Sequence, residues 1–281
     1  MSNQLTCPSC TASNMKAWGE KNGFTLYQCN DCTHIFADMS AHDWGKDNPE
    51  SFRKTMTNNR PDDDLKYYEH LATGEPKGRN VYNTTQLILK TTKDFSKQGL
   101  KSWLDVGCGS GFLLSTLKKQ NWEVTGVEPG AWGQIAAKKK EVTIVQGFLT
   151  KNTFKKKFDV VSAIDVLEHQ ADPSEFIQIA KHNLIDKGKI VIIIPFADSF
   201  HCKVFKDKWG MVAPPSHCQY FTYKSFETFV NRHGLNIDKQ AQFNAGRPRA
   251  FWRTRLTRAV IDTFVAVTLG GDQSLFILSK K

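Results

Sequence analysis

The order of apolar and polar positions between residues 102 and 195 predicts strands that alternate with helices. Five short runs rich in Val, Ile and Leu are expected to be strands, at residues 102–106, 123–127, 142–145, 158–164 and 189–195. Stretches with apolar residues at helical spacing lie between them, at residues 112–119, 132–140 and 173–184. This alternation is typical of a doubly wound, mostly parallel sheet with helices on both faces.

The pattern resumes after an irregular stretch at residues 196–223. A helix is expected at 224–233, closed by Gly234, and strands at 235–243 and 274–279 complete a seven-stranded sheet. Residues 40–80 are polar and rich in turn formers, and short helices are expected near 64–71 and 81–92. We therefore predict an α/β domain at 100–281, a helical connector and substrate cover at 40–99, and a small module at 1–39.

The strongest local signal is the glycine-rich turn that follows the first of these strands, Leu104-Asp105-Val106-Gly107-Cys108-Gly109-Ser110-Gly111. Glycines accept positive φ and let a ligand approach the backbone, and the helix that follows offers free N–H groups. Glu128, at the end of the next strand, is placed to hold a ribose diol. The spacing departs from the dinucleotide pattern G-x-G-x-x-G, so the prediction of a nucleotide site rests on the turn together with Asp105 and Glu128.

Four of the seven cysteines form two C-x2-C pairs, Cys7 with Cys10 and Cys29 with Cys32. The interval between the pairs is that of a structural zinc site, in which two tight turns present four thiolates to one ion. So short a segment cannot bury a core of its own, and metal binding would supply much of its folding energy. The alternatives are free thiols or redox dithiols, or His34 in place of Cys32 as the fourth ligand.

Charge and composition divide the chain in the same way. The net charge of +10 falls entirely after residue 99, because residues 1–99 hold 12 basic and 12 acidic residues. Lysine runs at 138–140 and 155–157 are expected to be solvated faces, with nucleic-acid contact as the alternative. The arginine-rich segment 247–258 is either the outer face of a packed helix or a phosphate-binding segment. No signal peptide or membrane-length apolar run is visible, which predicts a soluble, cytoplasmic protein.

Four ordered motifs over about residues 100–240 resemble those of class I S-adenosylmethionine-dependent methyltransferases. They are the glycine turn, Val127-Glu128-Pro129-Gly130, the segment 158–169 with Asp172-Pro173 after it, and Lys187-Gly188-Lys189-Ile190. The resemblance implies a Rossmann-like methyltransferase domain that binds S-adenosylmethionine. The zinc-ribbon-like head predicted from the cysteine spacing precedes this domain in the chain. The stretch Pro215-Ser216-His217-Cys218-Gln219-Tyr220-Phe221-Thr222 is also similar to a branch that acts on small molecules and sugars.

The resemblance assigns eight cofactor-binding positions: Asp105, Gly107, Gly109, Gly111, Glu128, Phe148, Asp165 and Val166. The three glycines would line the methionine and ribose side, and Glu128 would bind the ribose hydroxyls. Asp105 would contact the amino-acid end or order the turn, and Asp165 and Val166 would face the methionine portion. After the third strand, many members carry an Asp for the adenine amino group. Here Phe148 stands in that run and would pack beside adenine.

Methyl transfer is catalysed mostly by positioning, and a base is needed only where the acceptor must lose a proton. His169, after the fourth strand, and His217, in the irregular stretch, are the candidates because imidazole titrates near neutrality. The alternatives are that His217 orders its loop and that His169 lines the cofactor pocket.

The resulting prediction is a methyltransferase that uses S-adenosylmethionine and structural zinc, with a small metabolite or sugar-containing precursor as acceptor. The five arginines of segment 247–258 make a phosphate-bearing acceptor a candidate. The first rival is an RNA methyltransferase that grips RNA with the head and basic face, although the head is neutral. The second rival is a non-catalytic binding protein on the same scaffold. The sequence leaves open the acceptor, the atom methylated and the oligomeric state.

Overall fold

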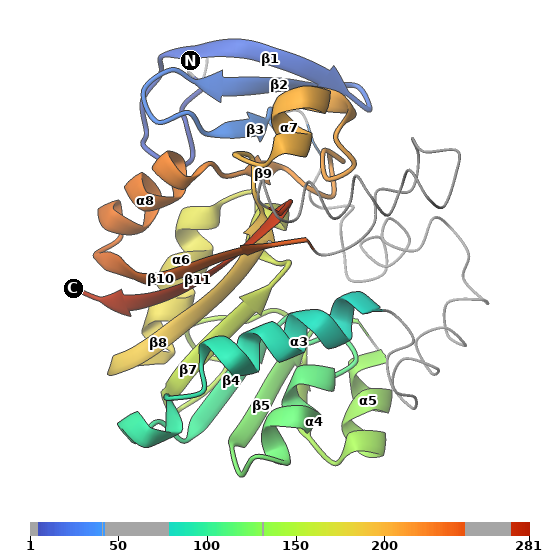
Figure 1. Cartoon of the computed structure of the whole chain (residues 1–281), viewed down its shortest axis with the longest axis vertical. Coiled ribbons are helices and arrows are strands. Elements are labelled where there is room, and N and C mark those ends of the chain that lie inside the picture. The colour runs from blue at the N-terminus through green and yellow to red at the C-terminus, as the bar shows by residue number, and fades with distance from the viewer. Residues whose placement is uncertain (1–4, 41, 43–78, 131, 245–270) are drawn as a thin grey trace.

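The computed structural model describes residues 5–40, 42, 79–130, 132–244 and 271–281 (Figure 1). The strands of its larger sheet are β4 Ser102–Val106, β5 Glu123–Glu128, β6 Thr143–Gln146, β7 Phe158–Ile164, β8 Leu184–Pro195, β10 Leu235–Phe243 and β11 Gln273–Lys280. Their order is β10-β11-β8-β7-β4-β5-β6. Each pair of neighbours from β8 to β6 is parallel, and β11 pairs antiparallel with both β8 and β10. The predicted seven-stranded, mostly parallel α/β sheet is confirmed.

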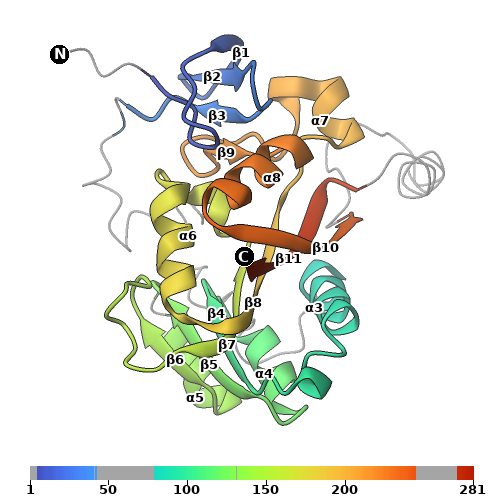
Figure 2. The same cartoon turned by 90° about the vertical axis from the view of Figure 1, so that its left-hand side faces the viewer.

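Helices cover both faces of this sheet (Figure 2). On one face lie α3 Arg79–Thr91, α4 Phe112–Lys118 and α5 Trp132–Lys140, and on the other α6 Pro173–His182 and α8 Tyr223–Arg232. Successive side chains of a strand point to opposite faces, so Trp103 packs in the apolar cluster under α4 and Leu104 in the cluster under α6 and α8. Each face therefore has its own apolar core. In sheets of this topology, ligands bind at the carboxyl edge of the parallel strands.

The N-terminal residues form a second, smaller sheet. Its strands β1 Met15–Lys21, β2 Phe24–Cys29 and β3 Ile35–Ala37 are antiparallel, and the fourth strand is β9 Gln219–Tyr220. Figure 1 shows this head in blue against β9, α8 and the short helix α7 Phe200–Phe205, all in orange. The head therefore shares its sheet with a segment almost two hundred residues away in the chain.

Some predicted boundaries are wrong. The helix expected over 173–184 ends at His182. The N–H of the next residue, Asn183, still donates to the Ile179 carbonyl, but the Asn183 carbonyl accepts from Phe158 N–H in the sheet. Strand β8 therefore begins at Leu184, not at 189. The helix expected at 81–92 is α3. The helix expected at 64–71 and the arginine-rich segment 247–258 lie outside the described residues.

None of the helices in the described ranges has the length and apolar character that a bilayer span requires.

Candidate functional site

The glycine turn joins β4 to α4 and wraps around the end of β5. Gly107, Gly109 and Gly111 have φ of 67°, 52° and 64°, in the left-handed region that favours glycine. A Cβ built on Gly107 would lie 2.7 Å from Cγ2 of Val166, which follows β7. The turn and the β7 end thus meet so closely that only glycine fits between them.

Glu128 ties this turn to the next loop. Its Oε2 accepts from Gly109 N–H at 2.9 Å and its Oε1 from Gly130 N–H at 2.8 Å. The side chain is buried, which raises the pKa of its carboxyl above the ordinary value. The acidic residue predicted to meet a ribose is therefore held by main-chain donors at the carboxyl edge of the sheet.

Asp105 lies beneath the turn. Its Oδ1 accepts from Ser162 Oγ at 2.6 Å, and Ser162 in turn accepts from Trp103 Nε1 at 2.7 Å. Burial raises the pKa of Asp105 to about 7, and the Glu128 charge adds to the rise. These contacts suit the option in which Asp105 orders the turn.

The other predicted cofactor-binding residues surround the same edge. Asp165 directly follows β7 with φ of 54°, and its Oδ1 accepts from Gln273 Nε2 at 2.7 Å. Phe148 follows β6 and is 59% exposed. The main chain beside it is fixed, because Gly147 N–H donates to the Glu128 carbonyl. The structure therefore gathers the predicted positions around one edge and leaves the Phe148 ring open to a ligand.

His169 and His217 lie together, with ring centroids 4.7 Å apart. His169 Nδ1 is 2.6 Å from the Ser216 carbonyl, and His217 Nδ1 is 2.8 Å from the Met211 carbonyl. A carbonyl can only accept, so both Nδ1 atoms carry the proton. His217 Nε2 keeps its lone pair, whereas the His169 ring also contacts the main chain of Asp165. Burial lowers the pKa of His169 to about 3 and the pKa of His217 below its ordinary value. Both imidazoles are therefore neutral at pH 7, and a pKa of about 3 makes His169 a weak base.

Glu168 is the residue that sequence reasoning missed. It is fully buried, and neither carboxylate oxygen has a hydrogen-bond partner within the described part of the chain. Burial raises the pKa of this carboxyl well above its ordinary value. Each of Glu168, His169 and His217 offers a ligand atom within 4.8 Å of the others, a donor set that suits a divalent cation. The available signal was an acidic residue directly before His169, next to the apolar pair Val166 and Leu167.

The four predicted zinc ligands converge in the head. Their Sγ atoms all lie within 4.8 Å of one another, and the Cys7–Cys32 and Cys10–Cys29 pairs are 3.5 Å apart. Four thiolates at 2.3 Å from one ion would be about 3.8 Å apart, so the cluster fits a tetrahedral zinc. The hydrogen bond from Cys7 lowers the pKa of Cys32 to about 4, while the pKa of Cys7 is raised. These two sulfur atoms therefore share one proton.

The two cysteine turns have the same backbone geometry. Thr11 N–H donates to the Cys7 carbonyl at 2.9 Å and Thr33 N–H to the Cys29 carbonyl at 3.0 Å. Thr11 and Thr33 both have φ of 67°. His34, the alternative ligand, instead contacts Gln219 through Nε2 at 2.9 Å and is not among the clustered ligands. The geometry thus favours four cysteines as the donor set.

Comparisons with known proteins identify the family of the larger domain. Residues 80–240 match the family model described as a methyltransferase domain. The chain is 36% identical over 100 residues to the ubiquinone biosynthesis O-methyltransferase of Histophilus somni (strain 2336), covering 31% of this chain and 42% of that protein. It is 28% identical over 174 residues to the mitochondrial ubiquinone biosynthesis O-methyltransferase of Arabidopsis thaliana, covering 53% and 54%. The alignments thus span about half, or less, of these relatives.

Among solved structures, the chain resembles a methyltransferase from Thermotoga maritima described as S-adenosylmethionine-dependent and as a possible histamine N-methyltransferase. The match covers 81% of this chain and 98% of that one, with 16% identity and a TM-score of 0.52. At this identity the likeness extends to the fold alone.

Proposed function

The chain belongs to the methyltransferase domain family of S-adenosylmethionine-dependent enzymes, and on this premise we propose that it transfers a methyl group from S-adenosylmethionine to a small-molecule acceptor. The observation that carries the proposal is the contact between Glu128 and the glycine turn, because it puts a carboxylate beside backbone shaped for a ligand.

The residues at the carboxyl edge suit this donor. Gly107, Gly109 and Gly111 would let its methionine and ribose approach the backbone, and Glu128 would accept from the ribose hydroxyls. The exposed ring of Phe148 would pack beside the adenine ring. When bound, the donor supplies a methyl group on a sulfonium, which an acceptor attacks in line.

His217 and His169 would accept the proton that the acceptor loses. The Nε2 lone pair of His217 is present at pH 7 because this ring is neutral and protonated at Nδ1, and an imidazolium that forms there would lie beside Glu168. Burial raises the pKa of the Glu168 carboxyl, and an imidazolium beside it would lower that pKa again by charge attraction.

An acceptor hydroxyl suits these groups best, because an alcohol or phenol must lose a proton during methylation. The relatives named above are O-methyltransferases, which favours the same class. We propose a small metabolite or sugar-containing hydroxyl compound, with a phosphate group as the further feature that segment 247–258 would recognise.

The four cysteines would hold one structural zinc ion, with no part in the reaction. Residues 1–39 would then form a zinc-ribbon-like module, 40–99 a substrate cover and 100–281 the methyltransferase domain.

A donor-consumption screen tests the proposal. Purified protein with S-adenosylmethionine should release S-adenosylhomocysteine with a metabolite or nucleotide-sugar fraction and not with RNA alone. Release with RNA, together with salt-dependent RNA binding, would favour the RNA methyltransferase instead. Donor binding without turnover in every fraction would favour the non-catalytic alternative.

A further inference from the structure

The loop that carries His217, residues 211–218, is attached to the head on both sides of His217. Asn22 in the β1–β2 turn donates from Nδ2 to the Pro214 carbonyl at 2.8 Å. At the other end of the loop, Ala37 N–H donates to the Cys218 carbonyl at 3.0 Å. The β3–β9 ladder continues this contact by pairing Phe36 with Gln219. His217 therefore lies between two attachment points that both belong to the head.

His34 makes the central contact between the head and this loop. Its ring is fully buried and lies 4.4 Å from the ring of Phe221 between centroids. Gln219 Nε2 donates to the Gln170 carbonyl at 3.0 Å, which turns Gln219 Oε1 toward His34 Nε2 at 2.9 Å. His34 Nε2 is therefore the donor.

The contact continues into the candidate catalytic cluster. Cys218 N–H donates to the Glu168 carbonyl at 2.8 Å, next to His169. The Ser216 carbonyl accepts from His169 Nδ1 at 2.6 Å. A displacement of Gln219 and its neighbours would therefore disturb both Glu168 and the pair of histidines.

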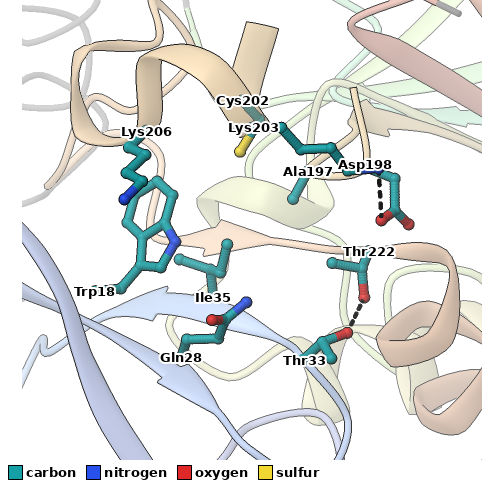
Figure 3. Close-up of a pocket in the computed structure, with 10 residues that line it drawn as sticks. All are labelled: Trp18, Gln28, Thr33, Ile35, Ala197, Asp198, Cys202, Lys203, Lys206 and Thr222. Carbon is teal, nitrogen blue, oxygen red and sulfur yellow. Dashed lines mark hydrogen bonds and ion pairs between the residues drawn. The ribbon is translucent and has the colours of Figure 1, made fainter. Parts of the chain in front are cut away.

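His34 is also part of the second cysteine turn. Its carbonyl accepts from Cys29 N–H at 2.8 Å, and Thr33 Oγ1 lies 2.7 Å from Thr222 Oγ1. Figure 3 shows this threonine pair beside a cavity of about 240 Å³ between the head and α7. The position of His34 is thus set by the geometry of the Cys29–Cys32 turn.

The first cysteine turn is attached elsewhere. Arg232 of α8 donates to the carbonyls of Pro8 and Ser9, both at 2.9 Å. Ser9 Oγ donates to the Ser225 carbonyl at 2.7 Å. One cysteine pair is thus anchored to α8 and the other to the His217 loop, and a metal bound by all four thiolates would join them.

We propose that the four-cysteine head positions the candidate base: His34 is a positioning residue that acts through Gln219 to hold the His217 loop against His169. The role of His217 in methyl transfer rests on the proposed function. The positioning itself rests only on the contacts above.

The test measures amide hydrogen exchange over residues 211–221 in the full-length, zinc-loaded chain. His34→Phe keeps the ring but removes the donor to Gln219, and Asn22→Gly removes the contact to Pro214 while accepting the φ of 52° at that position. We expect each to speed exchange there about tenfold and to shift the NMR signals of the His169 and His217 rings. Zinc removal by chelation should do the same. Asn14→Ala, a change within the head at a residue that contacts Asp31 and Asn30, is the matched control and should change neither readout.

The proposal is overturned if exchange over 211–221 and the ring signals match those of the wild type in both variants, or after zinc removal. A separate measurement of S-adenosylmethionine binding distinguishes failure of this proposal from failure of the proposed function. His34→Phe should bind S-adenosylmethionine within twofold of the wild type, because His34 contacts no residue of the glycine turn. If the wild type itself does not bind the donor, the proposed function fails, and the exchange result still decides the positioning.

Discussion

The ring of His169 meets the ring of His217 edge to face, at a centroid distance of 4.7 Å and an interplanar angle of 80°. Each ring donates its Nδ1 proton to a main-chain carbonyl, and His217 keeps the lone pair on Nε2. His169 N–H donates to the Val166 carbonyl at 3.1 Å, and the Val166 side chain lies against Gly107 of the glycine turn. A proton acceptor and the candidate donor site thus share one edge of the sheet.

We expect His217→Asn to lower kcat about 10²- to 10⁴-fold, the usual contribution of a general base. Donor affinity should stay within a few-fold, because His217 lies outside the glycine turn. The measurement is steady-state kinetics with the acceptor found in the screen. His182→Asn, on the exposed end of α6, is the control. An unchanged kcat in His217→Asn would leave His217 with a loop-ordering role alone.

Gly107→Ala should abolish donor binding, because its Cβ would clash with Val166 and its φ is positive. Gly99→Ala is the matched control: its φ of 85° costs about 1 kcal/mol in the same way, but nothing lies within 4 Å of its Cβ. It should bind the donor normally. Adding Val166→Ala to Gly107→Ala should restore part of the binding measured by calorimetry. Normal binding by Gly107→Ala alone would contradict the close approach described here.

Asp105 should make the stability of the protein depend on pH. Its folded pKa of about 7 exceeds the ordinary value of 3.8, so the folded state holds this proton more tightly than the unfolded state. At pH 3 Asp105 is protonated and does not lower the free energy of unfolding. As the pH rises from about 4 to 7 the carboxyl ionises and the free energy of unfolding falls. Full ionisation lowers it by an amount on the order of 4 kcal/mol.

Asp105→Asn should accordingly raise the free energy of unfolding at pH 8 relative to the wild type and leave it little changed at pH 4. Denaturant unfolding of the donor-free protein at the two pH values is the measurement. Equal differences at both values would show that Asp105 keeps an ordinary pKa.

Protein prepared without chelator should contain one zinc per chain, and Cys32→Ser should lose most of it. Cys202→Ser, a change at a buried thiol outside the cluster, should keep its zinc. The measurement is metal analysis by atomic emission. Well under one zinc in the wild type would contradict the four-thiolate site, and loss of zinc from Cys202→Ser would show that the effect is not local.

The parts of this molecule that could be predicted from sequence are those set by neighbours in the chain. The glycine turn and the cysteine pairs depend on local spacing, and the strand expected at 235–243 has these bounds in the structure. The missed features depend on distant contacts. The two-residue strand β9 has no pattern of its own and exists because Ile35 and Phe36 pair with it. The buried setting of Glu168 likewise arises only where the loop of residues 211–218 covers it.

We propose that the edge formed by the glycine turn and Glu128 binds S-adenosylmethionine. The decisive measurement is isothermal calorimetry on the wild type, Glu128→Ala and Glu123→Ala. Glu123 begins the same strand but is exposed at the opposite end. We predict that the wild type and Glu123→Ala bind one donor per chain with similar affinity, and that Glu128→Ala binds at least tenfold more weakly. Absence of binding by the wild type, or equal binding by all three proteins, would contradict the claim.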